Sequence, residues 1–305
     1  VVISTAGDER APDTAWGEGA FVTAIEAALL DGRVDAAVHS AKDVPTDEDP
    51  RLVIAAWTER EDPRDALVCR ARGGTLATLP PGARVGTDSP RRTAFLRGVR
   101  PDLVLHPLSG NVDTRLRKLD AGESDALVLA VAGLTRLGRA DRIDEILPLE
   151  VAVPAPGQGA LALQARADDG RTRTALALLE QPDSRVAVEA ERAFLAATGG
   201  GCRSPVGALA TVEHGTLRLS VAAERAVALP GGKRRRAGIV RLTSSGLASG
   251  RHAVARELAE RVVRLRDRAR VVVTRPADAA GPSVAALEVA GFEALAVPAI
   301  ETHPE

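Results

Sequence analysis

Short apolar runs alternate with amphipathic stretches along this chain, and this alternation limits the fold more than any other feature. The runs have the length of buried strands: Val1–Thr5, Ala36–His39, Leu52–Trp57, Ala66–Cys69, Leu103–Leu105 and Ala126–Ala130. Helical stripes lie between or after them: Phe21, Ile25, Ala28 and Leu29; Leu116 and Leu119; Val186, Ala190, Phe194 and Ala197. The pattern predicts an α/β architecture with ligands at the carboxyl ends of strands.

Two segments have the composition of crossings between domains. Glu59–Arg64 is a charged run that contains a proline, and Val153–Gly159 is rich in proline and glycine. A chain of 305 residues is long enough for two or three domains. Two crossings between two α/β lobes predict a hinged cleft.

A further unit is predicted after Cys202. It has strands near Val206–Thr211, Leu217–Ala222 and Ile239–Leu242, a hairpin at Pro230–Gly232, and a helix from about Leu247 to Arg268. Another strand, helix and strand follow at Arg270–Thr274, Ala279–Ala290 and Ala294–Val297.

Charge and composition exclude several classes. The chain has 40 basic and 41 acidic residues, so no net field favours nucleic acid, and the run Lys233–Arg236 is read as a solvated hairpin edge. We expect no membrane span and no signal peptide. Cys69 and Cys202 form neither a disulfide framework nor a metal motif, which favours a reducing compartment. The dinucleotide, Walker A, zincin and hydrolase motifs are missing.

The stretch His39–Thr46 follows an apolar strand and gathers groups that can do chemistry. Lys42 can bind an anion, and Asp43 can transfer a proton or stabilise a cation. The structural alternative is a polar loop whose aspartate caps a helix.

Three further segments each place arginines near the start of a predicted helix: Gly86–Arg92, Gly110–Leu116 and Ala130–Arg136. Hydroxyls and backbone amides at a helix N-terminus form an anion site, which arginines strengthen. A single such arginine is usually a surface residue, whereas several indicate a ligand with many carboxylates or phosphates.

Cys202 lies in the segment Gly199–Gly207, after three consecutive glycines and beside Arg203. A thiol on such a loop is suited to covalent chemistry or to close approach of a ligand, because an adjacent arginine favours the thiolate. The structural alternative is a small buried residue at a turn.

Taken together, these motifs resemble the porphobilinogen deaminase (hydroxymethylbilane synthase) family over about residues 1 to 265. Asp35–Pro45 resembles its active-site loop, Pro156–Ala160 its second hinge motif, and Glu191–Gly207 its cofactor loop. Its substrate-binding segments are resembled by Val85–Arg92, Leu108–Asp120 and Leu127–Gly138. The resemblance implies three domains: two hinged lobes like those of periplasmic binding proteins, and a small α+β domain. Their expected bounds are 1–59 with 160–178, then 65–153, then 182–268.

The resemblance also implies a mechanism. Cys202 would hold a dipyrromethane cofactor through a thioether, and this cofactor would prime the addition of four porphobilinogen units, each losing ammonia. Asp43 would be catalytic, since a carboxylate suits the cationic intermediate. Cofactor binding would involve Lys42, Ser40, Thr87, Ser89, Arg91 and Arg92, and substrate binding Arg115, Arg136 and Phe21. No metal is expected, and the protein would be a cytoplasmic monomer of tetrapyrrole biosynthesis.

The tail from Arg270 to Glu305 is similar to the start of uroporphyrinogen-III synthase, through Val271–Pro276. This similarity suggests hand-over of the product to that enzyme and a bifunctional gene.

The chain departs from the family pattern. A Gly-Thr-Arg-x-Ser-like motif is missing at the start, and unusual residues stand at four positions: Ser109, Glu18, Asp88 and Gln164. Two hypotheses therefore stay open: an active deaminase, and a non-catalytic relative that binds a polycarboxylate.

Overall fold

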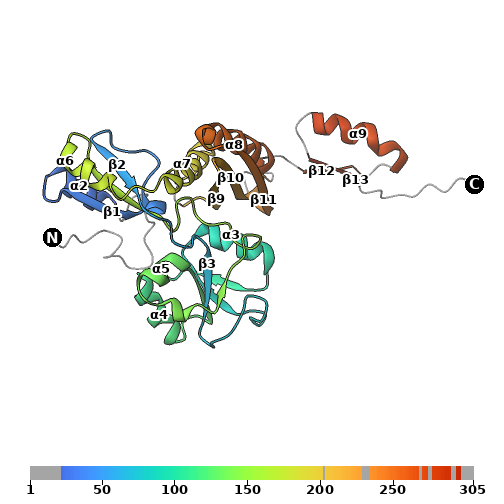
Figure 1. The fold of residues 1–305 in the computed structure, drawn as a ribbon. Coiled ribbons are helices and arrows are strands. Elements are labelled where there is room, and N and C mark those ends of the chain that lie inside the picture. Colours follow the sequence, from blue (N-terminus) through green and yellow to red (C-terminus); the bar gives the residue numbers. More distant parts are fainter. Residues whose placement is uncertain are drawn as a thin grey trace, which may run out of the picture.

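The computed structural model describes residues 22–201, 203–228, 234–267, 270–273, 277–289 and 293–296. The predictions that concern Val1–Thr5, Phe21, Cys202 and the hairpin at Pro230–Gly232 lie outside the described residues. Figure 1 shows the arrangement of the elements.

The first sheet joins two distant parts of the chain. Its order is β1-β8-β2, and both pairs are antiparallel. The strands are β1 (Ala36–Ser40), β8 (Leu161–Arg166) and β2 (Leu52–Trp57). Helices α2 (Thr23–Leu30) and α6 (Gly170–Ala177) pack on these strands. The sheet is therefore complete only after the chain has left and returned.

The second sheet is mixed and has the order β5-β4-β6-β3-β7. Its strands are β3 (Asp65–Cys69), β4 (Arg84–Gly86), β5 (Val104–His106), β6 (Ala126–Ala130) and β7 (Glu145–Ile146). Strand β4 is parallel to β5 and β6, whereas β3 is antiparallel to β6 and β7.

Alternate residues of β3 enter different cores, as the two-residue period of a strand requires. Leu67 and Cys69 belong to one apolar cluster, and Ala66 and Val68 to another. Helix α3 (Pro90–Val99) packs into the first cluster and α4 (Val112–Asp120) with α5 (Val131–Arg136) into the second. This sheet is therefore buried on both faces.

The third sheet is antiparallel, in the order β11-β10-β9. Its strands are β9 (Val206–Glu213), β10 (Thr216–Ala228) and β11 (Arg234–Leu247), and it packs against α7 (Pro182–Ala197) and α8 (Arg251–Asp267). The predicted bounds Ile239–Leu242 and the helix start at Leu247 were wrong. The ladder with β10 continues to Leu247, and the 3₁₀ turn η4 (Ala248–Gly250) precedes the helix.

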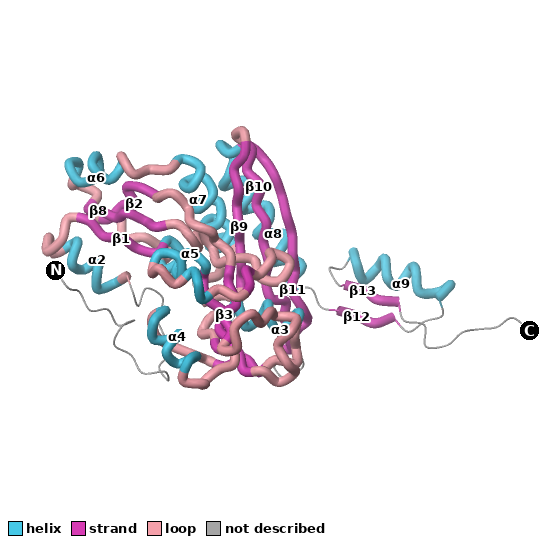
Figure 2. The backbone as a smooth tube through the Cα atoms, turned by 60° about the horizontal axis from the view of Figure 1, so that its bottom comes forward, coloured by secondary structure: helices cyan, strands magenta, loops and turns pink. Residues whose placement is uncertain are grey.

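Strands β12 (Arg270–Val273) and β13 (Glu293–Ala296) pair in parallel and are linked through α9 (Ala277–Val289). Figures 1 and 2 both show this unit apart from the other sheets. The strand–helix–strand order predicted for this part of the chain is found there.

The predicted α/β class with a smaller C-terminal unit is confirmed by these sheets and helices. Strands β7 and β8 and helix α6 were not predicted. Short 3₁₀ turns also occur at η1 (Ala41–Asp43) and η2 (Ala140–Arg142). The chain passes between the first two sheets after Trp57 and before Leu161, while the exact domain bounds stay a prediction.

Candidate active site

A buried carboxylate anchors the place where the first two sheets meet. Asp65, the first residue of β3, is fully buried and accepts from Arg91 Nη1 at 2.6 Å and from Arg92 Nη2 at 2.8 Å. Gln158 Nε2 donates to the same carboxylate at 3.0 Å. Burial opposes ionisation of Asp65, but the two arginines hold its pKa well below the usual range.

Arg91 and Arg92, both predicted to bind cofactor, are occupied by protein oxygens. Arg91 Nη1 also donates to Val153 O at 2.7 Å, and Arg92 Nη1 donates to Val128 O at 2.9 Å. Arg91 Nε is buried without a partner among the described atoms. These arginines tie α3 to β3, β6 and the second crossing. Their role in cofactor binding stays a prediction.

The turn η1 at the end of β1 carries the predicted catalytic group. Ala41 N donates to Ala160 O at 3.0 Å, which fixes the turn against the second crossing. Gly157 allows this approach, because a Cβ at its position would lie 3.0 Å from Ala41 Cβ. Arg192 Nη1 donates to Val44 O at 2.8 Å and so holds the loop that follows Asp43.

Asp43 forms an electrostatic cluster with Lys42, with Arg115 of α4 and with Arg92 of α3. Burial raises the pKa of Asp43, and Lys42, His39, Arg115 and Arg92 act in the opposite direction. Burial also lowers the pKa of Lys42 to about 8, an effect that Asp43 partly offsets. The Asp43 carboxylate can stabilise a positive charge that develops nearby. The cations beside it can bind anionic groups of a ligand.

A hydrogen-bond chain connects His39 to helix α2 and is buried at His39 and Gln164. His39 Nε2 lies 3.0 Å from Gln164 Oε1, and Gln164 Nε2 donates to Glu26 Oε1 at 2.9 Å. Because the Glu26 carboxylate accepts, the amide oxygen faces the ring, and His39 Nε2 carries the proton. Burial lowers the pKa of His39, which favours the neutral ring.

The loop before α3 has the predicted form of a helix N-terminus. Ser89 is the N-cap and accepts from Arg92 N at 3.4 Å, while Thr87 Oγ1 accepts from Ser89 N at 3.2 Å. Thr87 is buried, so its hydroxyl shapes the loop.

The two other predicted arginines differ in their surroundings. Arg115 Nε donates to Gly110 O at 2.7 Å, and its Nη2 lies 3.5 Å from Asp88 Oδ2. Arg136 Nη2 instead donates to Gly159 O at 2.6 Å, in the second crossing. Arg115 also acts to lower the pKa of Asp43 and so belongs to the cluster around it, whereas Arg136 contacts the crossing.

Sequence reasoning missed Glu191, which is fully buried on α7. Arg60 Nη1 donates to its Oε1 at 2.6 Å, and Gly157 N donates to its Oε2 at 2.6 Å. Ala210 N of β9 donates to Oε1 at 2.7 Å. The sequence does contain a signal for this buried position, because Glu191 lies on the same helix face as the apolar residues Ala187 and Phe194, four residues before it and three after it.

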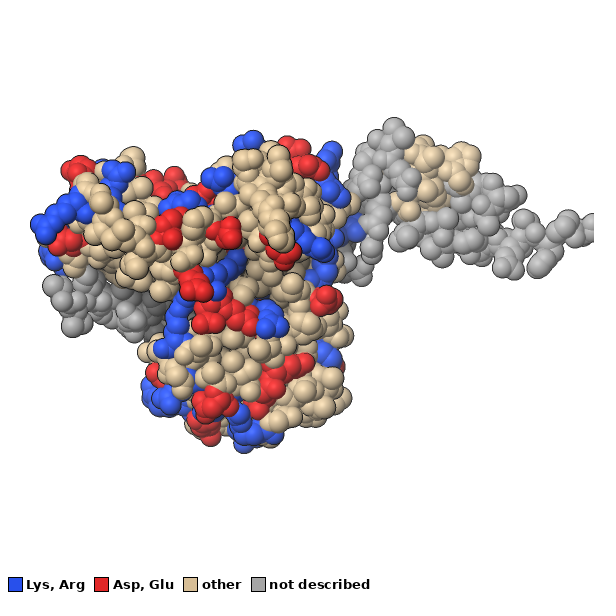
Figure 3. Space-filling view, in the orientation of Figure 1, with Lys and Arg blue, Asp and Glu red and all other residues tan. Residues whose placement is uncertain are grey.

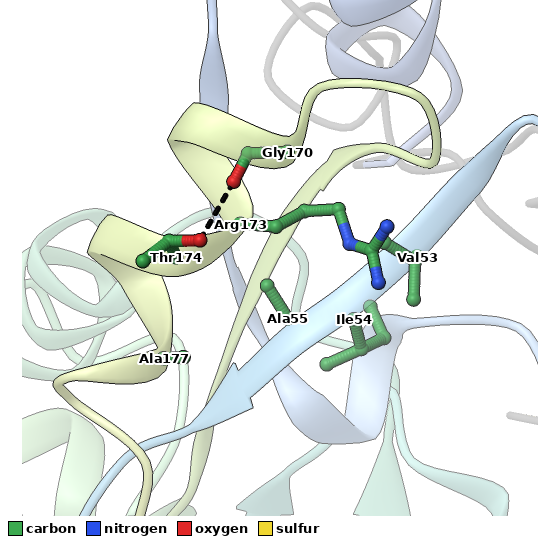
Figure 4. Close-up of a pocket in the computed structure, with 7 residues that line it drawn as sticks. All are labelled: Val53, Ile54, Ala55, Gly170, Arg173, Thr174 and Ala177. Atoms are coloured by element: carbon green, nitrogen blue, oxygen red, sulfur yellow. Dashed lines mark hydrogen bonds between the residues drawn. The ribbon is translucent and has the colours of Figure 1, made fainter.

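Figure 3 shows acidic and basic side chains side by side where the parts built on the first two sheets meet. A separate hollow of about 410 Å³ lies between β2 and α6, and none of the predicted site residues lines it. Figure 4 shows the Arg173 side chain reaching toward Val53 across this hollow.

Among the described residues, no group of three or more His, Cys, Asp or Glu could hold a metal ion. None of the helices that the structure describes is long and apolar enough to cross a membrane.

The family model described as porphobilinogen deaminase, dipyromethane cofactor binding domain, matches residues 1–174. The model for the porphobilinogen deaminase C-terminal domain matches residues 186–232. The chain belongs to the porphobilinogen deaminase family. Porphobilinogen deaminase of Roseiflexus castenholzii is 54% identical over 220 residues, which are 71% of this chain and 72% of the relative. That of Mycobacterium marinum is 54% identical over 213 residues, 70% of this chain and 68% of the relative.

Among solved structures, a periplasmic binding protein of Salmonella typhimurium shows similarity at a TM-score of 0.31 and 15% identity. The similarity covers 53% of this chain and 69% of that protein.

The cofactor of porphobilinogen deaminases is a dipyrromethane, whose pyrroles carry acetate and propionate groups. Within the described residues, the donors of Lys42 and Arg115 are only partly engaged: Lys42 Nζ lies 3.5 Å from Gln158 Oε1, and only Nε of Arg115 makes a short hydrogen bond, at 2.7 Å to Gly110 O. Asp43 lies in the same cluster and could accept from pyrrole N–H groups. The donor set therefore fits a ligand of this kind.

Proposed function

We propose that this chain is a hydroxymethylbilane synthase, a transferase that joins four porphobilinogen molecules head to tail with loss of ammonia, in tetrapyrrole biosynthesis. The observation that carries the proposal is the cluster in which Asp43, beside Lys42 after the end of β1, interacts electrostatically with Arg115 of α4 and Arg92 of α3. Such a cluster offers cations for carboxylates and one carboxylate for a developing positive charge.

Asp43 is the proposed catalytic group. As ammonia leaves the aminomethyl carbon of porphobilinogen, positive charge develops on the pyrrole, and a nearby carboxylate stabilises it. Asp43 is half-buried, and charges attract more strongly where water is partly excluded, so its position strengthens this interaction. Lys42 and Arg115 are the proposed carboxylate binders, and Ser40, Thr87 and Ser89 are proposed to supply hydroxyls.

Cys202 is the proposed attachment point of the cofactor, through a thioether at Sγ. When bound, dipyrromethane would supply the pyrrole carbon to which the first substrate unit is joined. For the described residues around this loop, Gly201 N donates to Ser204 Oγ at 3.0 Å. Phe21, Arg91, Arg92 and Arg136 keep their expected binding roles as part of this proposal.

The proposal is tested by the mass of the purified protein. We expect the intact protein to carry a covalent addition, and the Cys202→Ser variant to lack it. Asp43→Asn should retain the addition and lose at least about 100-fold in turnover, because a charged stabilising group is removed. An unmodified mass that persists after incubation with porphobilinogen would contradict the enzyme proposal.

The second candidate is a non-catalytic relative that holds a polycarboxylate. Two residues favour it: Ser109, where the family resemblance leads one to expect arginine, and Asp88, which adds a negative charge beside Arg115. Such a protein would bind unreactive acetate- and propionate-bearing pyrroles but would release no ammonia from porphobilinogen.

We further propose that the chain acts as a cytoplasmic monomer and hands its product to uroporphyrinogen-III synthase. The tail after Arg270, with its β12–α9–β13 unit, supports a link to that enzyme. Size-exclusion chromatography with light scattering tests the monomer, and a coupled assay with that synthase tests the hand-over.

A further inference from the structure

Asp88 stands between β4 and α3, next to the arginine that reaches the candidate site. Its Oδ2 lies 3.5 Å from Arg115 Nη2. The Arg115 side chain is 23% exposed and that of Asp88 30% exposed. Because both keep surface in contact with solvent, a dissolved anion can reach this pair.

Arg115 is held in place by one contact and directed toward Asp88 by the other. Its Nε donates to Gly110 O at 2.7 Å, which orients the guanidinium plane. Gly110 has φ +114, and a Cβ there would lie 2.7 Å from Thr114 Cγ2, so the loop that presents this carbonyl needs glycine. The remaining Nη2 edge is then the part of Arg115 that faces an acidic partner.

The charges around Arg115 come from three elements. Burial lowers the pKa of Arg115, Asp88 and Asp43 raise it, and Arg92 lowers it. Arg115 is thus shared between a carboxylate in the proposed catalytic position and a second carboxylate at the start of α3. The second one occupies a place suited to anions, since it stands beside a helix N-terminus capped by Ser89.

We propose that Asp88 is a built-in competitor for carboxylate ligands at Arg115, and thereby a specificity-determining residue. The inference rests on the proposed function, in which Arg115 binds a carboxylate of the substrate. A ligand carboxylate displaces Asp88 from Nη2 and then lies near its negative charge. Carboxylate-bearing pyrroles are therefore bound more weakly than the arginine alone would allow, and pyrroles with a neutral group at that position are not penalised.

The test measures binding and turnover separately. The binding probe is a pyrrole that carries acetate and propionate but no aminomethyl group, titrated into the full-length protein by calorimetry. The variants are Asp88→Asn, which keeps the size and removes the charge, and Asp88→Glu, which keeps the charge. Asp113→Asn is the matched control, since Asp113 lies on the same helix as Arg115 and pairs instead with Arg139 at 3.2 Å.

We expect Asp88→Asn to lower the dissociation constant of the probe about fivefold, the effect of removing a partly exposed charge pair. Asp88→Glu and Asp113→Asn should stay within about twofold of the unaltered protein. An unchanged or weaker affinity of Asp88→Asn would overturn the inference, as would absence of binding in every variant. Binding that appears only in Asp88→Asn would support it.

Ammonia release from porphobilinogen is recorded in parallel on the unaltered protein. Its absence counts against the proposed enzyme activity alone, because the binding series does not depend on turnover. The melting temperature of each variant checks that a change in affinity does not reflect loss of folded protein.

Discussion

At the scale of single residues, the chemistry of the candidate site follows from burial acting on charge. Lys42 and Asp43 are adjacent in the turn η1, and burial pushes each toward its neutral form. Each also favours the charged form of the other, because their charges are opposite, and so partly offsets the effect of burial on the other's pKa. His39 is held by Gln164 and Glu26 and adds a neutral ring at neutral pH.

The lowered pKa of Lys42 predicts how activity declines at alkaline pH. Its pKa is lowered to about 8, so the ammonium that binds carboxylate is present below that pH and is lost as pH rises through it. We expect kcat/KM for porphobilinogen to fall above about pH 8, as the charge of the free enzyme is lost. Lys42→Arg should move this decline to higher pH, because arginine stays charged.

Lys118→Arg serves as the control for that profile. Lys118 Nζ donates to Ser109 O at 3.2 Å and is not among the groups that perturb Lys42. A kcat/KM that stays flat from pH 7 to 9.5 in the unaltered protein would contradict the assignment.

At the scale of elements, the two crossings run side by side and are joined by backbone hydrogen bonds, so we call them the paired ribbon. Thr58 N donates to Leu161 O at 3.1 Å, and Glu61 N donates to Gly159 O at 3.1 Å. Arg60 Nε donates to Gln158 O at 3.0 Å. The paired ribbon needs glycine at 159, which has φ +97 and whose Cβ would lie 2.3 Å from Glu61 O.

Gly159→Ala should therefore destabilise the protein by roughly 2–5 kcal/mol, from backbone strain and a steric clash together. Gly73→Ala separates the two causes, because Gly73 has φ +80 but open space around it. Gly73→Ala should lower the free energy of unfolding only by the backbone strain of a positive φ, roughly 1–2 kcal/mol. Urea unfolding gives both values, and equal losses would show that the clash is relieved without cost.

At the scale of the whole molecule, Glu191 joins three parts of the structure. Its carboxylate binds Arg60 and Gly157, one from each crossing, and the backbone of Ala210 in the third sheet. The loop that carries Cys202 follows the same helix. Glu191 therefore ties the helix that precedes this loop to both crossings.

Glu191→Ala should lower the free energy of unfolding by about 3–5 kcal/mol, because it leaves the Arg60 guanidinium without its partner in a buried ion pair. We also expect calorimetric unfolding to broaden or split, since the link between the sheets is weakened. Glu189→Ala is the control on the same helix: its partly exposed pairs with Arg185 and Arg251 should be worth less than about 1 kcal/mol each. Equal melting temperatures for the two variants would contradict the special role of Glu191.

The sequence by itself determined most of the segments that become strands and helices, although not β7, β8 or α6, and it identified the loops that carry reactive side chains. Periodicity along β3 and the helical stripe of α7 are local properties, and the motif around Lys42 and Asp43 needs only neighbours in the chain. Local order also identified the family resemblance, which the comparisons confirm.

The tertiary structure decided which partner each charged side chain meets. Arg91 and Arg115 are both arginines near the start of a helix, yet Asp65 neutralises one of them in the interior, and the other faces Asp88 at the edge of the site. It also placed β8 between β1 and β2 and put Glu191 at the crossings. These outcomes depend on contacts between residues far apart in the chain, and burial then sets the strength of each charge.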